Sequence, residues 1–284
     1  MIHMKGFEKL PRDSRGKTNR RKPKCLFLLL CWLLLPIWSA LAQDTLEAQG
    51  IRFRLIPGGY YPLGSSMGEP GRYADETTLH RVRVDPFYIA VTEITNAQYA
   101  RFVKATGHKK PLYCEDKNLN GPNQPVVGVT WNDAAAFCRW LTKVTGAPHE
   151  LPTENQWEVS ARGGLVGQPY PWGAQAPDAG GVFRANFRTS LPGATGFSFT
   201  APVGSFPANG FGLFDMAGNV SEWCQDHYVP LPTGGPFKPG VLRLLKGGSW
   251  IAGPRDLRPA ARQSAPPHYA DGYIGFRVVR LPHP

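Results

Sequence analysis

The sequence predicts an α+β fold with little regular secondary structure, in which a few short helices lie against a small sheet and long ordered loops fill the rest. The first observation is composition, since 32 glycines and 28 prolines make up about a fifth of the 284 residues. Aromatic residues nevertheless reach 12%, whereas disordered segments rich in glycine and proline lack them. The second observation is that the ordered segments are short and carry their own start and stop signals.

Two segments predict the first strands. Ile51 to Ser65 alternates apolar and polar residues around Pro57-Gly58-Gly59, which predicts a β-hairpin that opens the domain. Arg81 to Thr95 repeats the alternation and predicts the next strand pair.

Three helices are predicted by capping boxes, in which a threonine and the residue three positions later bond to each other's backbone N–H groups. A glycine ends each helix, as is common where the backbone turns left-handed. The boxes are Thr95 with Gln98, Thr130 with Asp133 and Thr153 with Gln156, and the ends are Gly107, Gly146 and Gly163. Beyond Gly163 the sequence predicts mostly turns and short strands.

The first 42 residues predict a secretory signal peptide. A basic segment precedes an apolar run from Cys25 to Trp38, and Ala40-Leu41-Ala42 forms a cleavage-type site before Gln43. The run is too short to span a bilayer comfortably, so we expect cleavage after Ala42, a periplasmic protein and no stable membrane anchor. The Sec route is favoured over the twin-arginine route, which Arg20-Arg21 leaves open. Residues 43–284 are then expected to form a single domain.

The leader also accounts for most of the positive charge. Residues 1–42 hold nine Lys/Arg and two Asp/Glu, so +7 of the formal +11 belongs to them and +4 remains for the rest. Because that remainder contains no basic run, nucleic acid is not an expected partner.

Three cysteines follow the leader: Cys114, Cys138 and Cys224. Three thiols allow at most one internal disulfide, whose pairing the sequence leaves open. The sequence has no CxxC, and its histidines are scattered, so no local zinc or iron site is predicted.

Eight phrases carry a resemblance to a known family. In order, they are IPGGYYPLGS, FYIAVTEITNAQYARFV, QPVVGVTWNDAAAFCRWL, LPTENQWEVSARGG, YPWG, TAPVGSFPANGFGLFDMAGNVSEW, LLKGGSW and GFRVVR. Their order and spacing, from Ile51 to Arg280, resemble those of the formylglycine-generating-enzyme, or sulfatase-modifying-factor, family. The resemblance implies a variant of the C-type lectin fold, which agrees with the fold class predicted above.

The resemblance also implies how the chemistry differs. The enzymes that name the family hold Cu(I) with two cysteines just after the Gly247-Gly248-Ser249 phrase, because this soft ion prefers sulfur ligands. Here Ala252 stands where the first cysteine is expected, and no cysteine follows in the shortened segment. We therefore expect no copper, and the sequence shows no other redox cofactor site.

Structural calcium is a further implication of the resemblance, since its sites use hard oxygen ligands. One loop would supply Asp215, Gly218, Val220 and Glu222. The other would supply Asn186, Phe187 and Phe197, although its carboxylate position falls near Thr195. Simple turn capping is the alternative for Asp215 and Glu222.

A pocket beside the Gly247-Gly248-Ser249 phrase is the expected functional site. Ser221 stands there where the family has a tryptophan, which should widen the cleft. The arginines suit an acidic or catecholate-bearing ligand, because guanidinium groups pair with planar anions, although a structural role is equally consistent with the pattern. The candidate catalytic residues are Ser249, Arg255, Arg258, Arg262 and His268, and the candidate substrate-binding residues are Ser221, Trp250 and Asp256.

Exported members of this family that lack the copper cysteines imply a function. They point to a periplasmic maturation factor that oxidises the chromophore precursor of a peptide siderophore, pyoverdine. The expected partner is that precursor or another small peptide, together with other periplasmic maturation proteins. The alternative is a noncatalytic binding or assembly module, stiffened by calcium, because loss of the cysteines would also fit binding alone.

Overall fold

A computed structural model describes residues 44–190, 193–230 and 241–282. The predicted signal peptide lies outside these residues. The described residues group into one compact unit. Among the described residues, no helix is long and apolar enough to cross a lipid bilayer.

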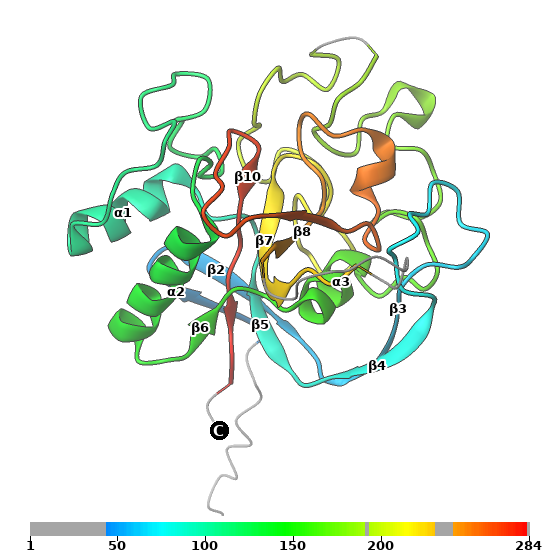
Figure 1. Ribbon diagram of the computed structural model, residues 1–284, viewed down its shortest axis with the longest axis horizontal. Coiled ribbons are helices and arrows are strands. Elements are labelled where there is room, and N and C mark those ends of the chain that lie inside the picture. Colours follow the sequence, from blue (N-terminus) through cyan, green and yellow to red (C-terminus); the bar gives the residue numbers. More distant parts are fainter. Residues whose placement is uncertain (1–43, 191–192, 231–240, 283–284) are drawn as a thin grey trace, which may run out of the picture. The chain divides into compact units, whose positions relative to one another are not determined.

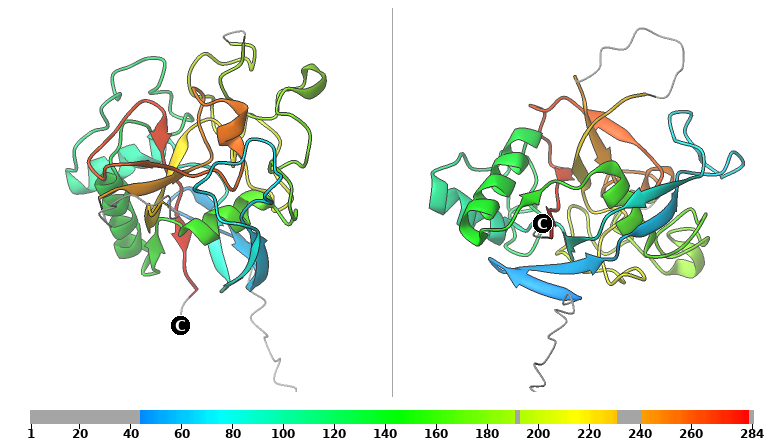
Figure 2. Two further views of the ribbon diagram at one scale, coloured as in Figure 1. Left: turned by 45° about the vertical axis from the view of Figure 1, so that its right-hand side comes forward. Right: turned by 90° about the horizontal axis from the view of Figure 1, so that it is seen from below.

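The structure is mixed α+β with small sheets and few helices, as predicted (Figure 1). The helices are α1 (Asn96–Thr106), α2 (Trp131–Thr145) and α3 (Glu154–Arg162), with 3-10 turns η1 (Ala179–Gly181) and η2 (Pro254–Leu257). The strands are β1 (Thr45–Ala48), β2 (Ile51–Ile56), β3 (Gly59–Leu63), β4 (His80–Val84), β5 (Phe87–Ala90), β6 (His149–Glu150), β7 (Ser221–His227), β8 (Arg243–Lys246), β9 (Gln263–Ala265), β10 (Ile274–Gly275) and β11 (Val279–Arg280). Figure 2 shows from two further directions how much of the chain runs in loops between them.

The described strands form three sheets. Their orders are β1-β2-β5-β11-β6, β10-β7-β8-β9 and β3-β4. Most pairs are antiparallel, but β10 runs parallel to β7, with Ile274 opposite Ser221. This parallel pairing brings the last part of the chain beside the loop that precedes β7.

All three helices begin and end as predicted. Each capping box is present in both directions, with Thr95, Thr130 and Thr153 as the caps. Gly107, Gly146 and Gly163 close the helices with left-handed backbone. These signals are local, so sequence alone places the helix ends.

The predicted pairing of the early strands is wrong. Ile51–Ser65 forms two strands, but β2 pairs with β5 and β3 pairs with β4. Ile56 lies opposite Phe87 and Gly59 lies opposite Val84, so the two pairs share one register and form a single long antiparallel ribbon. A proline interrupts each of its two strands, at Pro57 and at Pro86. Because proline has no N–H to donate to a ladder, Pro57 and Pro86 bend the ribbon from one sheet into the next.

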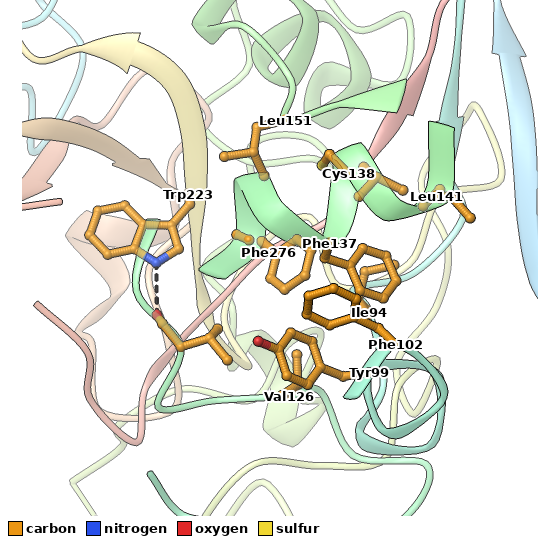
Figure 3. Packing of buried hydrophobic residues seen from close by; sticks show 14 of the residues in the cluster. Ile94, Tyr99, Phe102, Val126, Phe137, Cys138, Leu141, Leu151, Trp223 and Phe276 are labelled. Carbon is orange, nitrogen blue, oxygen red and sulfur yellow. Dashed lines mark hydrogen bonds between the residues drawn. The ribbon is translucent and has the colours of Figure 1, made fainter. Parts of the chain in front are cut away.

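An aromatic cluster forms the centre of the larger core. Tyr99 and Phe102 of α1 pack on Phe137 of α2, with ring centroids 5.9 and 5.6 Å from it. Figure 3 shows these rings gathered with Phe276, and shows the Trp223 indole N–H donating to the Val129 carbonyl at 3.1 Å. The amphipathic faces of α1 and α2 are thereby buried against the chain's C-terminal segment.

His149, on β6, is a buried base within this core. The hydrogen bond between its Nδ1 and the Ala147 carbonyl, 2.7 Å long, requires a proton on Nδ1. Its Nε2 is buried and has no hydrogen-bond partner among the described residues, and its ring lies 5.6 Å from that of Phe53. Burial lowers the pKa of His149 to about 4, so the neutral ring is the folded form at neutral pH.

We expect His149 to make stability fall with acidity. Above pH 6.5 the ring is neutral in both states. Between pH 6.5 and about 4 the unfolded chain binds a proton that the folded chain does not, which lowers the free energy of unfolding by at most about 1.4 kcal/mol per pH unit. Urea denaturation of His149→Gln across this range should give a flatter profile than wild type. The exposed His227→Gln control should keep the wild-type slope, and an equal slope in all three proteins would contradict the assignment.

Candidate functional site

The Gly247-Gly248-Ser249 phrase makes a tight turn at the end of β8. Gly247 and Gly248 have φ of 91° and 68°, a left-handed backbone that favours glycine. A Cβ on Gly248 would lie 3.0 Å from the Asp256 carbonyl oxygen, so η2 packs directly on this turn. Ser249 is buried, and Trp250 is half-buried.

Trp250 and Ser221 meet through the segment that precedes β10. The Trp250 indole N–H donates to the Gly272 carbonyl at 3.0 Å, and the Ser221 backbone N–H donates to the Tyr273 carbonyl at 2.9 Å. The Ser221 hydroxyl donates to the Gln263 side chain at 3.1 Å. The structure therefore brings these two predicted substrate-binding residues to one place.

Arg258 is held by two carboxylates. Its guanidinium forms a two-pronged ion pair with Glu76 and also donates to Glu69 at 2.9 Å. All three side chains are buried, with Arg258 only 1% exposed. The charge of Arg258 is thus neutralised inside the protein, and the pair ties the loop 64–79 to η2.

The two neighbouring arginines are also occupied. Arg255 donates to the Gly71 and Arg72 carbonyls at 2.7 and 3.0 Å. Arg262 forms a two-pronged ion pair with Glu154 at 2.8 and 3.2 Å and donates to the Asp75 carbonyl. These contacts favour a structural role for the arginines, and a catalytic role for them stays a prediction.

The other two predicted residues are Asp256, on the 3-10 turn that packs against Gly248, and His268. Asp256 accepts a hydrogen bond from the Tyr73 hydroxyl at 2.7 Å, which raises the pKa of Tyr73 after the larger effect of burial. His268 is exposed, and its role in proton transfer stays a prediction.

Sequence reasoning missed a cluster of phenols beside Trp250. Tyr113 and Tyr269 both donate to Asp271, at 3.1 and 2.7 Å, and the Tyr269 and Tyr273 hydroxyls lie 3.2 Å apart. The only available signal was the repeated tyrosine of the stretch PPHYADGY, because Tyr113 comes from a distant loop.

A second missed feature is a fully buried ion pair. Arg277 donates to both oxygens of Glu222 at 2.7 Å, and the Trp157 indole N–H donates to the same carboxylate at 2.7 Å. Asn219 donates to Glu93 at 3.0 Å. Burial, and then the nearby Asp215 charge, raise the pKa of Glu93 well above its usual value. The signal was the presence of charged residues within apolar runs, Glu93 in FYIAVTEI and Arg277 in GFRVV.

In the loop expected to bind calcium, the carboxylates of Asp215 and Glu222 already have hydrogen-bond partners within the protein. Both Glu222 oxygens are bonded to Arg277, and Asp215 accepts the Gly204 backbone N–H at 2.6 Å. The other two expected ligands are the carbonyl oxygens of Gly218, whose own N–H donates to the Gly247 carbonyl, and of buried Val220. In this arrangement the expected ligands do not fit calcium, because the cation would have to share the Glu222 carboxylate with the Arg277 guanidinium.

The other loop lacks a carboxylate ligand. The Thr195 hydroxyl lies 3.0 Å from Asn186 Oδ1 and 3.2 Å from the Phe197 carbonyl oxygen, so it bridges two of the expected ligands. Phe187 is buried. Within the described ranges there is no group of three or more His, Cys, Asp or Glu side chains able to hold a metal ion.

The three described thiols come from phrases other than the one after Gly247-Gly248-Ser249. Ala252 is 8% exposed and its carbonyl accepts the Arg188 backbone N–H at 2.9 Å. Cys114, Cys138 and Cys224 are all free, from a loop, α2 and β7. Burial raises the pKa of the Cys138 and Cys224 thiols, which disfavours the thiolates that copper needs.

Two cavities lie away from the predicted pocket. One of about 360 Å³ lies between α2 and β6, lined by Trp131, Arg139 and Gln225 among others. Another of about 440 Å³ lies beside α1, between Tyr99 and Pro111. Neither is lined by a residue predicted to be catalytic.

Comparison with known proteins gives consistent results. Residues 41–282 match the sulfatase-modifying factor enzyme 1-like domain. The formylglycine-generating enzyme of Streptomyces coelicolor is 35% identical over 79% of this chain and 87% of its own length. The serine/threonine-protein kinase pkn1 of Chlamydia pneumoniae is 34% identical over 80% of this chain, which spans only 37% of that protein. The structure of PvdO from Pseudomonas aeruginosa superposes with a TM-score of 0.73 at 31% identity, over 84% of this chain and 98% of PvdO.

We expect Arg258→Met to destabilise the fold strongly. The change leaves Glu76 and Glu69 buried without their cation, which should lower the free energy of unfolding by about 3–5 kcal/mol. Arg83→Met is the matched control, because the Arg83–Asp85 pair is exposed and should contribute less than about 1 kcal/mol. Urea denaturation measures both, and similar small losses would show that Arg258 is not a structural clamp.

We expect calcium to leave thermal stability unchanged. A ligand that binds the folded state raises the melting temperature, so the melting temperature in excess calcium chloride should match that in EDTA within about 1 °C. A calcium-dependent rise of several degrees, abolished in Asp215→Asn, would establish the site that the resemblance implies.

Proposed function

Because the chain belongs to the family of sulfatase-modifying factor enzyme 1-like domains, we propose that it is a periplasmic maturation factor that oxidises the chromophore precursor of a peptide siderophore. The observation that carries the proposal is the similarity to PvdO over 98% of that protein. The predicted leader and the absence of any cysteine after Gly247-Gly248-Ser249 support the same choice among members of the family. The periplasm, where the predicted leader directs the chain, is the compartment of the reaction.

The chemistry we propose uses the precursor's own aromatic ring as the source of electrons. With Ala252 in place of a copper-binding cysteine, the oxidation removes two hydrogen atoms from the precursor, and dioxygen takes them up as hydrogen peroxide. The protein binds the ring, orients it and limits its access to water. Half-buried Trp250, whose indole N–H donates to the Gly272 carbonyl, is the side chain we propose to contact the ring, and buried Ser221 supports the same segment from behind.

A noncatalytic binding or assembly module is the second candidate. It is favoured by the ion pairs of Arg258 and Arg262, which occupy two of the side chains predicted to act on substrate. In this role the chain would present its loops to the precursor or to another periplasmic maturation protein, which would carry out the oxidation.

Deletion of the coding sequence tests the biological role. We expect the deletion strain to secrete a nonfluorescent siderophore that retains two extra hydrogen atoms, as measured by mass spectrometry, and the restored coding sequence to recover the mature form. A deletion strain that secretes fully mature fluorophore would refute both candidates.

Purified components separate the two candidates. Turnover of isolated precursor by the mature chain alone, with peroxide formed in equal amount, is the result expected of the enzyme. Stoichiometric binding without turnover would instead identify the noncatalytic module.

A further inference from the structure

Asp271 is a carboxylate surrounded by phenols. Its two oxygens accept hydrogen bonds from Tyr113 at 3.1 Å and Tyr269 at 2.7 Å, and the hydroxyl of Tyr273 lies 3.2 Å from that of Tyr269. The backbone N–H of Gly272 donates to Asp271 at 2.7 Å. All of these donors are neutral, so the negative charge of Asp271 is shared among hydroxyl and amide groups.

The cluster is held rigidly beside the predicted pocket. The Asp271 carbonyl accepts the Gly128 backbone N–H at 2.9 Å. Trp250 donates to the Gly272 carbonyl, and its ring packs on Phe199 with centroids 5.2 Å apart. The carboxylate is therefore fixed next to the residues that the sequence predicts to bind substrate.

The cluster also faces solvent. Tyr269 is 37% exposed, and Tyr113, Asp271 and Tyr273 are partly exposed. Burial, and then the hydrogen bond to Asp271, raise the pKa of Tyr113. The hydrogen bonds to Tyr273 and then to Asp271 raise the pKa of Tyr269, so both phenols stay protonated as donors. An incoming ligand can thus reach a carboxylate already arranged to accept bonds from aromatic hydroxyl groups.

We infer that Asp271 and its three tyrosines bind a hydroxylated aromatic ring, a phenol or a catechol. The ligand's hydroxyl donates to Asp271 in place of the Tyr269 hydroxyl, and its ring lies among the aromatic side chains of Trp250, Tyr113 and Tyr273. This inference deepens the proposed function, on which it rests, by naming the acceptor for the substrate's ring. It also replaces the expected recognition by arginine, since the guanidinium groups of Arg258 and Arg262 are already paired.

Calorimetric titration of the mature protein with two small probes tests the inference. 4-Methylcatechol has the two hydroxyl groups, whereas 3,4-dimethoxytoluene has the same ring without a donor. We expect saturable binding of the catechol at one site and at least about tenfold weaker binding of the dimethoxy compound, because a site built for a hydroxyl group rejects the analogue that lacks it. Absence of catechol binding, or equal binding of both probes, would overturn the inference.

Three variants locate the site. Asp271→Asn keeps the shape but removes the charge, and should weaken catechol binding at least about tenfold. Tyr269→Phe removes the competing hydroxyl and should bind as tightly as wild type or more tightly, which keeps the test decisive if Asp271→Asn folds poorly. Tyr60→Phe, on the exposed face of β3, is the control and should change nothing. Wild-type affinity in Asp271→Asn, or loss of binding in Tyr269→Phe, would contradict the assignment.

The precursor assay keeps the two proposals distinguishable. If wild type fails to oxidise the precursor yet binds catechol through Asp271, the proposed oxidation is wrong and the binding site stands. If wild type oxidises the precursor and Asp271→Asn does so with unchanged KM, the inference is wrong and the function stands.

Discussion

A guanidinium and a carboxylate, both shielded from solvent, join separate stretches of this chain. Arg277 donates to both oxygens of Glu222 and also to the carbonyls of Ala90 and Phe214, while Trp157 donates to the same carboxylate. Removing one partner of such a pair leaves an uncompensated charge in a low-dielectric interior, which is far costlier than losing an exposed ion pair. The paths of β5, β7, α3 and the C-terminal segment all depend on this contact.

Arginine fastens the loops at the candidate site in the same way. Arg258 and Arg262 reach across more than a hundred residues to Glu76 and Glu154, so long segments without regular structure still have fixed positions. For function, these ion pairs change which charged group a ligand can reach. The cations are already neutralised, whereas Asp271 remains partly exposed among neutral donors.

The sequence could predict the features that depend on contacts between residues close together in the chain, and it could not predict those that depend on distant residues. Thr130 and Gly146 mark the ends of α2 because their contacts lie within a few residues, and the fold class follows from composition and the order of the phrases. The pairing of β2 with β5 could not be predicted, because proline at 57 acts as a bend rather than as a turn. The partners of Arg258 and the contact of Tyr113 with Asp271 also escaped, since each joins residues more than 150 positions apart.

We propose that the family scaffold persists here without copper–thiolate chemistry. Ala252 stands where the family resemblance places a copper-binding cysteine, and Cys138 and Cys224 are buried thiols with raised pKa. Elemental analysis of the purified mature protein after exposure to Cu(I) tests this most directly. We expect the protein to retain no stoichiometric copper after chelation. One tightly held copper per chain, lost in Cys138→Ser or Cys224→Ser, would contradict it.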